Sequence, residues 1–464
     1  MHLDPDQSRA VDAPCGHILV LAPAGSGKTK VLTERMGRLI KRGAAPSSIL
    51  CITFTRKAAG ELKDRLSGTP GTGQAWIGTF HSICYRILRA ESSPLSALGY
   101  GGGFTIVDAT GARAIMKGIL NRLGVEASPE EVLRAVSLCR LTLKDDPRDG
   151  FLHKAASLYR RRLLELNAMD FDDLLVNTLW LLQSSDEIRL RYARRFRHVL
   201  IDEFQDLDPC QWEIVKLLAS VHGNLFAVGD PQQEIFAFKG GAVGITLEYM
   251  RNSSTRTYML RRNYRSAGNI VVAANSLIKH GTTTVPIPQF PVRDWGDPID
   301  LYVASNNQDE AIYVAELIKD LPLKGIAPGE IAVLTRTRAQ LAPICRELIQ
   351  ARVPFRLSEG TGPAKAIKVM TIHASKGKEF SHVILPGLEE GIIPHFRAAN
   401  ESDAEEERRL MCVALTSARD KLYLSYSMEK TPGRRPEYVG PSRFLKEIDE
   451  RLLDIVNFRE ASAS

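Results

Sequence analysis

The chain alternates between short apolar runs and longer stretches with the spacing of amphipathic helices. HILVL at 17–21 is followed by a glycine-rich turn and then by a helical pattern, KTKVLTERMGRLIK. ILCITF at 49–54 and AWIGTF at 75–80 lead into helical patterns in the same way. Strands that alternate with helices are typical of a parallel α/β sheet. The pattern therefore predicts an α/β lobe in the first part of the chain.

Residues 90–170 interrupt this alternation, because they have helical spacing, are rich in Leu, Arg and Ala, and contain no convincing strand. We interpret them as a helical insertion. A proline-rich stretch at 282–298 is interpreted as a linker. A second α/β series begins with IDLYVAS at 299–305. The expected fold class is therefore α/β, with two parallel-sheet lobes and a helical insertion in the first.

Composition narrows the class of protein without identifying it. The 464 residues suffice for roughly two to four domains. No apolar run approaches about 18 residues, and the N-terminus lacks the features of a secretory signal, so we expect a cytoplasmic chain without a membrane partner. The seven cysteines are scattered, which favours reduced, buried thiols over a zinc site. The net charge of +7 permits a nucleic-acid partner but does not decide for one.

LAPAGSGKTK at 21–30 has the properties of a phosphate-binding loop between a strand and a helix. Its glycines let the backbone close around a phosphate, with N–H groups facing the anion. Lys28 would contact the β- and γ-phosphates, and the Thr29 hydroxyl would bind Mg²⁺. The strict pattern requires glycine at 22, where this chain has alanine. The predicted nucleotide-binding residues here are Ala24, Gly25, Ser26, Gly27, Lys28 and Thr29.

HVLIDEFQD at 198–206 places two adjacent carboxylates, Asp202 and Glu203, at the end of an apolar run. Two adjacent carboxylates repel each other unless a positive charge lies nearby. An Mg²⁺ ion bound with a nucleotide would supply that charge, with Asp202 as a metal ligand and Glu203 as the base for the attacking water. A helix N-cap after a strand is the alternative interpretation. Together with the phosphate loop, the pair predicts an NTPase.

Further segments resemble, in order and along nearly the whole chain, the superfamily 1A helicases of the UvrD/Rep type. They include CITFTRKAAGEL, GTFHSICYRIL, AMDFDDLL, VGDPQQEIFAFKGG, RRNYRSAGNI and VMTIHASKGKEF. The resemblance implies RecA-like lobes. It also implies that Gln7 reads adenine, Tyr264 stacks on it, Gln233 senses the γ-phosphate, Arg265 neutralises charge there, and Glu379 contacts the ribose. The nucleotide would lie between the lobes.

The same resemblance implies a single-stranded DNA path across the lobes, or a junction of single and double strands. Its candidate contacts are Phe54, Thr55, Thr79, Phe80, His81, Phe236, Phe238, Arg336, Thr371 and His373. Two of them, Phe236 and Phe238, resemble the family's aromatic ledge for stacked bases. Taken singly, Phe54 and His81 also fit core positions, and Arg336 also fits a surface charge.

Two departures from the family pattern bear on function. TSA at 416–418 replaces the usual TRA, so Ser417 stands where the family has a second arginine at the γ-phosphate. Arg419 lies two residues on, which on a helix is about 200° away and on the wrong face. Only the short segment 358–366 joins pieces that in UvrD and Rep are separated by the large 2B domain. The chain therefore resembles a compact form without 2B.

The domains expected on this basis are lobe 1A in two parts, a 1B-like insertion and lobe 2A, at 1–85 with 170–280, 86–169 and 281–464. The favoured function is an ATP-dependent, DNA-stimulated translocase and helicase moving 3′ to 5′, with repair as its generic role. One alternative is a DNA-gated ATPase subunit that works with a nuclease, as compact UvrD-like subunits do in the Gabija antiviral system. Another is an inactive nucleotide-binding scaffold. No nuclease motif is evident.

Overall fold

The computed structural model describes residues 3–69, 71–143, 150–235, 243–281, 285–357, 365–396, 398, 400–430, 437–438 and 440–456. By their contacts, the residues form two compact units. The first comprises 1–21, 28–229 and 236–259, and the second comprises 22–27, 230–235 and 260–464. The second unit thus begins before residue 281, where the sequence predicts the second lobe, because α12 (Gly268–Lys279) packs against α16 (Glu401–Thr416).

The first unit is built on a six-stranded parallel sheet in the order β3-β2-β6-β7-β1-β8. Apolar runs form its central strands, because a strand covered on both faces buries every side chain. All five residues of β2 are buried, as are four of five in β1. The strands are β1 His17–Leu21, β2 Ile49–Thr53, β3 Trp76–Thr79, β6 His198–Ile201, β7 Leu225–Gly229 and β8 Thr255–Met259.

Parallel pairing brings the carboxyl ends of these strands to one edge of the sheet, where ligands of open α/β sheets bind. The register pairs Leu21 with Gly229, Ile201 with Ala227, and Thr53 with Thr79. The chain leaves this edge into the helices α2 (Lys28–Lys41), α3 (Arg56–Leu66) and α4 (Phe80–Ala90). The carboxylate pair after β6 and the predicted DNA contacts after β2 and β3 therefore follow strands that end at one edge, where β1 also ends and leads into the phosphate loop.

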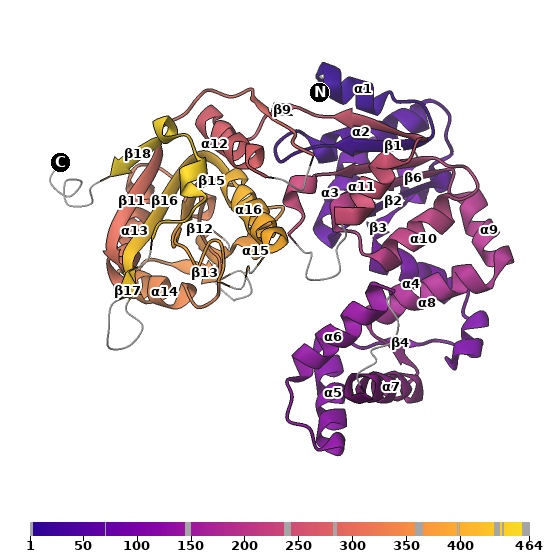
Figure 1. Ribbon diagram of the computed structural model, residues 1–464. Helices are drawn as coiled ribbons and strands as arrows, with labels where there is room; N and C mark the ends of the chain where they lie inside the picture. The colour runs from indigo at the N-terminus through magenta and orange to yellow at the C-terminus, as the bar shows by residue number, and fades with distance from the viewer. Residues whose placement is uncertain are drawn as a thin grey trace. The chain divides into compact units, whose positions relative to one another are not determined.

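The predicted helical insertion is present, with its own core. Its helices are α5 Ala109–Leu123, α6 Pro129–Leu141 and α7 Gly150–Glu165, which pack around Met116, Ala155 and Tyr159. Figure 1 shows them beyond α4 and α8 (Phe171–Ser184), which separate them from the sheet. The expectation of no strand here was wrong: β4 (Thr105–Ile106) pairs with β5 (Ala168–Met169). Strands of two residues are too short to produce an alternating pattern.

The remaining helices of the first unit cover its sheet or lie beside the insertion. They are α1 Pro5–Val11, α9 Asp186–Arg195, α10 Pro209–Ala219 and α11 Val243–Arg251.

The second unit holds an eight-stranded sheet with the path β13-β14-β12-β15-β16-β11-β18, in which β17 pairs antiparallel with β16. All other pairs in it are parallel. Its core includes Val314, Ile318, Val333 and Val369. The strands are β11 Ile299–Asn306, β12 Ile331–Thr335, β13 Phe355–Leu357, β14 Ile367–Thr371, β15 Phe380–Leu385, β16 Ala418–Lys430, β17 Glu437–Tyr438 and β18 Leu453–Val456. Its other helices are α13 Asn307–Leu323, α14 Leu341–Gln350 and α15 Ile372–Ser375. The prediction of an α/β fold with two parallel-sheet lobes is confirmed.

The proline-rich stretch packs more closely than a linker. Ile287 is fully buried and Gln289 is 4% exposed. The two-residue strand β10 (Phe290–Pro291) pairs with β9 (Arg262–Asn263). The sequence interpretation missed this, because proline-rich segments carry no regular spacing of apolar residues. No helix among the described residues is long and apolar enough to cross a membrane.

The N-cap of α10 provides a test of the fold that is independent of function. Burial raises the pKa of Asp208 to about 7, and its carboxylate accepts a hydrogen bond of 2.8 Å from the Gln211 N–H. A raised folded-state pKa stabilises the fold below the unfolded pKa, and this contribution is lost as pH rises through about 7. Asp208→Asn keeps the cap without the charge. Part of the contribution is already lost at pH 5, which lies above the ordinary pKa of an aspartate. We therefore expect Asp208→Asn to increase the free energy of unfolding by on the order of 1 to 4 kcal/mol at pH 8 and by less at pH 5.

Thermal unfolding of both chains at pH 5 and pH 8 measures this difference. Asp108→Asn is the matched control, because Asp108 is an exposed N-cap whose carboxylate accepts 2.8 Å from the Gly111 N–H. An equal change in Tm for Asp208→Asn at both pH values would contradict the prediction.

Candidate nucleotide site and DNA interface

The loop from Ala22 to Gly27 joins β1 to α2 and has the backbone of a phosphate-binding loop. Gly25 and Gly27 have φ angles of +77° and +91°, which side chains rarely adopt. The Ser26 hydroxyl donates 2.7 Å to the Pro23 carbonyl and closes the turn. The helix then starts at Lys28, directly after the loop, as in helix N-termini that bind phosphate. The sequence prediction of strand, glycine turn and helix is confirmed here.

The carboxylate pair follows β6 at the same sheet edge. Asp202 is 7% exposed, and its carboxylate accepts 3.1 Å from the Glu203 N–H. Burial raises the pKa of Asp202 well above its ordinary value, and the charges of Glu203 and Asp206 raise it further, whereas Lys28 lowers it. The nearby lysine therefore offsets only part of the negative charge. A site of this kind favours an additional cation.

Gln205 holds the side chain of Glu203, a contact that the sequence analysis did not anticipate. Glu203 has a left-handed backbone, with φ of +50°, and its Oε2 accepts 2.7 Å from Gln205 Nε2. Gln205 is 1% exposed and packs against Gly229 at the end of β7. A Cβ at Gly229 would lie 2.7 Å from Gln205 Oε1, so only glycine fits beside this side chain. The glutamine within DEFQD was the available signal.

The donor set suits Mg²⁺ that arrives with a nucleotide. Among the described residues, no group of three or more His, Cys, Asp or Glu side chains is arranged to hold a metal ion. Mg²⁺ usually needs only one or two protein oxygens, with phosphates and water completing its shell. The Asp202 carboxylate and the Thr29 hydroxyl have the required chemistry. The residues therefore fit a metal that is shared with phosphates better than a metal held by protein alone.

In the second unit, Arg265 is the cation that the sequence predicts to neutralise charge at the γ-phosphate. Its Nε lies 2.7 Å from Glu379 Oε2, and its Nη1 donates 3.3 Å to the Thr416 carbonyl at the end of α16. The neighbouring Tyr264 is 40% exposed. The structure thus brings three of the predicted nucleotide residues of this unit, Tyr264, Arg265 and Glu379, into one neighbourhood.

Gln233 ends a short 3-10 helix, Pro231–Gln233, and is 9% exposed. Lys376 Nζ donates 2.5 Å to the Gln233 carbonyl, and Arg409 Nε donates 2.8 Å to the carbonyl of Glu234. No role for these two cations was predicted from the sequence.

In the first unit, Gln7 is 1% exposed and forms a capping box with Asp4, so the start of α1 fixes its position.

The structure around Ser417 and Arg419 differs from the sequence interpretation in the secondary structure of Arg419. Ser417 is 3% exposed, and its hydroxyl donates 2.7 Å to the Val413 carbonyl. The helix ends at Thr416, so Arg419 belongs to strand β16 and not to the helix assumed from the sequence. Its guanidinium donates 2.5 Å to Ser381 Oγ and lies 3.2 Å from Glu330. Arg419 is therefore engaged with these groups.

A pocket of about 550 Å³ in the first unit gathers several of the predicted DNA contacts. Phe54, Thr79 and His81 line it, and Phe54 is 41% exposed. Thr79 caps α4, with its hydroxyl 3.3 Å from the Ser82 N–H, and so places His81 on the first turn of that helix. Burial lowers the pKa of His81, which favours the neutral imidazole. Exposed aromatic rings of this kind are the surfaces on which nucleic-acid bases stack.

The structure adds further residues to this pocket, among them Arg56, Tyr85 and Phe171. Tyr85 lies one helical turn from His81, and the Phe171 ring meets the His81 ring edge-on at 5.6 Å. Phe171 is 42% exposed. Helical spacing from His81 and the AMDFDDLL segment were the available signals. A guanidinium among exposed rings suits a phosphate beside a stacked base.

Other predicted DNA contacts lie elsewhere. Phe80 is 5% exposed and belongs to the core, so it is not brought into the pocket. Thr55 is exposed and caps α3, where its hydroxyl accepts 3.1 Å from the Ala58 N–H. Phe236 and Phe238 lie outside the described residues.

In the second unit, Arg336, Thr371 and His373 surround the start of α15. Arg336 forms a forked pair with Glu407, with Nη2 2.5 Å and Nε 2.9 Å from its carboxylate oxygens. Thr371 caps α15 through a bond of 3.4 Å from the Ala374 N–H. Burial and the charge of Arg336 lower the pKa of His373 to about 4, so its ring is neutral at physiological pH. Arg336 is thus committed to an ion pair inside this unit.

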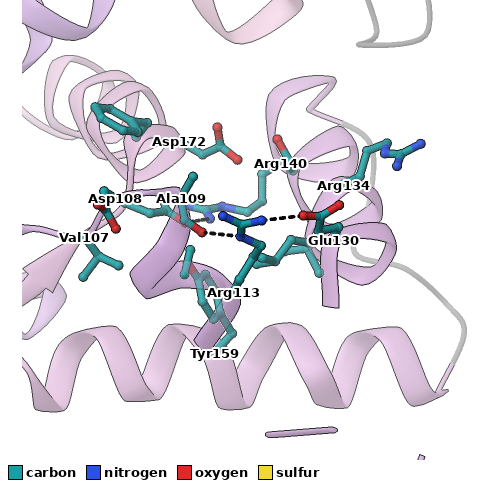
Figure 2. Close-up of a pocket in the computed structure, with 15 residues that line it drawn as sticks. Val107, Asp108, Ala109, Arg113, Glu130, Arg134, Arg140, Tyr159 and Asp172 are labelled. Carbon is teal, nitrogen blue, oxygen red and sulfur yellow. Dashed lines mark hydrogen bonds and ion pairs between the residues drawn. The ribbon is translucent and has the colours of Figure 1, made fainter. Parts of the chain in front are cut away.

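A second cavity, of about 480 Å³, lies between the helical insertion and the start of α8 and shares Phe171 with the first pocket. Figure 2 shows Arg113 in its centre, bonded to Glu130 at 2.7 Å and to the Ala109 carbonyl at 3.3 Å. Arg140 pairs with Asp170 at 3.2 Å and also with Asp173, on both sides of Phe171 in the sequence. Acids of the same region engage these two arginines. The two ion pairs of Arg140 connect α6 to the segment that carries Phe171.

Comparisons with known proteins identify the family. The model of the UvrD/REP helicase N-terminal domain matches residues 3–253. The model of the UvrD-like helicase C-terminal domain matches residues 258–363 and 358–429.

Among relatives, the ATP-dependent DNA helicases PcrA of Staphylococcus epidermidis and Staphylococcus aureus are each 26% identical over 637 residues. Those alignments cover 98% of this chain and 87% of each relative. PcrA of Leuconostoc citreum is 35% identical over 373 residues, which cover 76% of this chain and 49% of that protein. Since the N-terminal model alone spans more than half of the chain, the match is not confined to a local motif. The chain therefore belongs to the UvrD-like superfamily 1A helicases and is an enzyme of the DNA helicase class.

Proposed function

We propose that the chain is an ATP-dependent translocase and helicase on single-stranded DNA, moving 3′ to 5′. The observation that carries the proposal is the shared sheet edge of the first unit. Strands β1 and β6 present the phosphate loop and the carboxylate pair there, and strands β2 and β3 lead into the aromatic pocket. In this proposal, loops of one sheet contribute both to hydrolysis and to DNA binding, which would couple a change at one to the other.

In this proposal, Lys28 neutralises the β- and γ-phosphates, and Glu203 accepts the proton of the attacking water. Asp202 and Thr29 would hold Mg²⁺, which supplies positive charge to the phosphate oxygens when it is bound. Gln205 keeps the Glu203 carboxylate directed, because it fixes Oε2 at 2.7 Å. In the second unit, Arg265 would neutralise γ-phosphate charge, Gln233 would sense that phosphate, and Glu379 would contact the ribose. Tyr264 and Gln7 would hold adenine.

We further propose a compact domain organisation without 2B. Two observations support it. The C-terminal family model matches in two pieces that meet at residues 358–363, where the sequence places the short connection. The alignment with the Staphylococcus relatives extends over 637 residues, whereas this chain has 464, so those relatives carry residues that it lacks. The domain limits predicted from the sequence form part of this proposal, with the second lobe beginning near Leu260.

A second candidate function is a DNA-gated ATPase subunit that works with a nuclease and separates few strands itself, as in Gabija-like defence. The specific observation that favours it is the environment of Ser417. This residue provides no cation, and Arg419 is engaged with Ser381 and Glu330. A single catalytic arginine would leave hydrolysis slow until a partner supplies or orients a further cation.

The first test is ATP hydrolysis by the purified chain with and without single-stranded DNA, with Lys28→Ala as the control. Strong stimulation that Lys28→Ala abolishes would support an autonomous motor. ATP binding without stimulation would favour the second candidate, and co-purification with a nuclease would then decide for it. Neither binding nor hydrolysis in any condition would refute both.

Phe171→Ala is expected to raise the Kd for single-stranded DNA by roughly 5- to 150-fold, because each stacked base contributes about 1–3 kcal/mol. Fluorescence anisotropy of labelled oligo-dT measures this change. Phe290→Ala is the matched control, since Phe290 is 57% exposed in the second unit and lies outside the aromatic pocket. Equal effects of both substitutions would argue against a DNA site at the pocket.

Ser417→Arg is expected to raise kcat for ATP at saturating DNA by about ten-fold or more, because a second arginine at the γ-phosphate is worth 10³-fold or more in related phosphoryl transfers. The smaller estimate reflects the burial of the site, where Ser417 is 3% exposed. Ser417→Ala removes only the hydroxyl and serves as the control. If Ser417→Arg retains the wild-type Tm but shows no gain in kcat, Ser417 is not what limits turnover.

A further inference from the structure

Two buried amide side chains meet the outer side of the phosphate loop. Asn263 Nδ2 donates 3.0 Å and Gln289 Nε2 donates 2.8 Å to the same acceptor, the Ala24 carbonyl. Asn263 Nδ2 also donates 2.9 Å to Gln289 Oε1. Asn263 is 1% exposed and Gln289 is 4% exposed. We call these two side chains the amide bracket.

The amide bracket is itself held in place. Gln289 exchanges two backbone bonds with the Asn275 side chain, at 3.0 Å and 2.8 Å. Strand β10 continues from Gln289 and pairs with β9, which ends at Asn263. A side chain fixed in this way cannot turn away from Ala24 without breaking several bonds. The packing of the proline-rich segment therefore determines where the amide bracket lies.

The amide bracket orients a peptide group that would bind phosphate. In a planar trans peptide the C=O and the following N–H point in opposite directions. Two donors on the Ala24 carbonyl therefore direct the Gly25 N–H to the other side, into the loop. The Ala24 carbonyl lies in a buried residue, at 4% exposure, and would lose its donors without the amide bracket. A buried carbonyl without donors favours rotation of the whole peptide group.

The Asn263 side chain also holds the backbone at Arg265. Asn263 Oδ1 accepts 2.9 Å from the Arg265 N–H and 3.0 Å from the Ser266 N–H. The Tyr264 N–H donates 2.9 Å to the Gly25 carbonyl. A Cβ at Gly25 would lie 2.7 Å from Asn263 Oδ1 and 2.8 Å from Arg265 Cβ, so the two segments touch. One side chain, Asn263, thus connects the loop peptide with the backbone of Arg265.

We propose that Asn263 and Gln289 are positioning residues for the triphosphate of the nucleotide, and that they set the Gly25 N–H and Arg265 relative to each other. This rests on the proposed ATP hydrolysis. Neither residue touches the nucleotide in this account; each acts through Ala24 or Arg265. Asn263 lies between β8 and α12 in the chain, whereas Gln289 lies between α12 and β10. A substitution at Gln289 therefore changes nucleotide affinity from a segment that carries no motif.

Gln289→Glu and Gln289→Met test the proposal. Glutamate keeps an acceptor for Asn263 but faces the Ala24 carbonyl with a carboxylate, while Met only removes the donor. We expect the Kd for ADP and for a non-hydrolysable ATP analogue, from calorimetry, to rise about ten-fold or more for Glu and roughly three-fold or more for Met. The Kd for oligo-dT should stay near the value of the unchanged chain for both variants. The Tm without nucleotide should stay near it for Gln289→Met, whereas the buried carboxylate is expected to lower the Tm of Gln289→Glu. Gln350→Glu, an exposed position on α14, is the matched control and should change neither affinity.

The ATP kinetics provide a second measurement for Gln289→Met, where KM should rise more than kcat falls. ADP affinity within two-fold of the unchanged chain for both variants would overturn the proposal. A parallel loss of ADP affinity, oligo-dT affinity and Tm in both variants would also overturn it, since that indicates a structural role alone. If the unchanged chain binds no ADP, the proposed function itself fails, and the amide bracket with it.

Discussion

Glu203→Gln is expected to lower kcat for DNA-stimulated ATP hydrolysis by roughly 10²- to 10⁴-fold, the usual contribution of a general base. Glutamine has the same size and can still bond to Gln205, but it does not accept the proton of the attacking water. ATP and DNA affinities should stay within a few-fold, because Lys28 and the aromatic pocket are unchanged. Steady-state hydrolysis at saturating oligo-dT, together with calorimetry for ATP-analogue binding, measures both properties.

Glu213→Gln is the control for Glu203→Gln, because it makes the same change on α10, where Glu213 pairs with Lys216 at 2.6 Å. It should leave kcat unaltered. If Glu203→Gln reduced kcat by less than about three-fold, another group would have to accept the proton, and the role assigned to Glu203 would be withdrawn.

Arg265→Ala is expected to reduce kcat by on the order of 10³-fold with a smaller effect on DNA binding. The loss should be large because Ser417 offers no second cation and Arg419 is engaged elsewhere. Arg265→Lys keeps the charge without the planar fork and should recover only part of the rate. The measurement is again kcat at saturating ATP and oligo-dT.

Arg346→Ala, an exposed arginine on α14, is the control for Arg265→Ala and should hydrolyse ATP at the rate of the unchanged chain. A loss of less than ten-fold for Arg265→Ala would show that a different cation meets the γ-phosphate. Lys376, which contacts the Gln233 carbonyl, is then the first residue to replace.

The sequence predicted those features that depend on local pattern. Buried strands such as β2 are continuous apolar runs, and the phosphate loop is a contiguous segment of glycines and a lysine. The carboxylate pair was visible because both acids end one such run. These features follow from neighbouring residues alone, so no knowledge of the fold was needed to find them.

Features that depend on distant residues escaped prediction. Gln289 binds a carbonyl 265 positions away, and nothing in its own segment indicates this. The contrast between Phe80 and His81 has a similar cause: adjacent residues on a helix face different directions, and only the packing of α4 shows which one is buried. The error at Arg419 arose from a helix end, which sequence patterns locate poorly.

The sheet order has a consequence for how the chain emerges during synthesis. Strand β1 lies between β7 and β8, and both partners follow it by about 200 residues or more. At about 5–20 residues per second, a ribosome would need roughly 10 to 50 s to complete them after β1 has been made. Throughout that interval the apolar segment HILVL has no strand beside it. A nascent chain or fragment that ends before Thr255 would leave β1 at an open sheet edge, where other chains can pair with it.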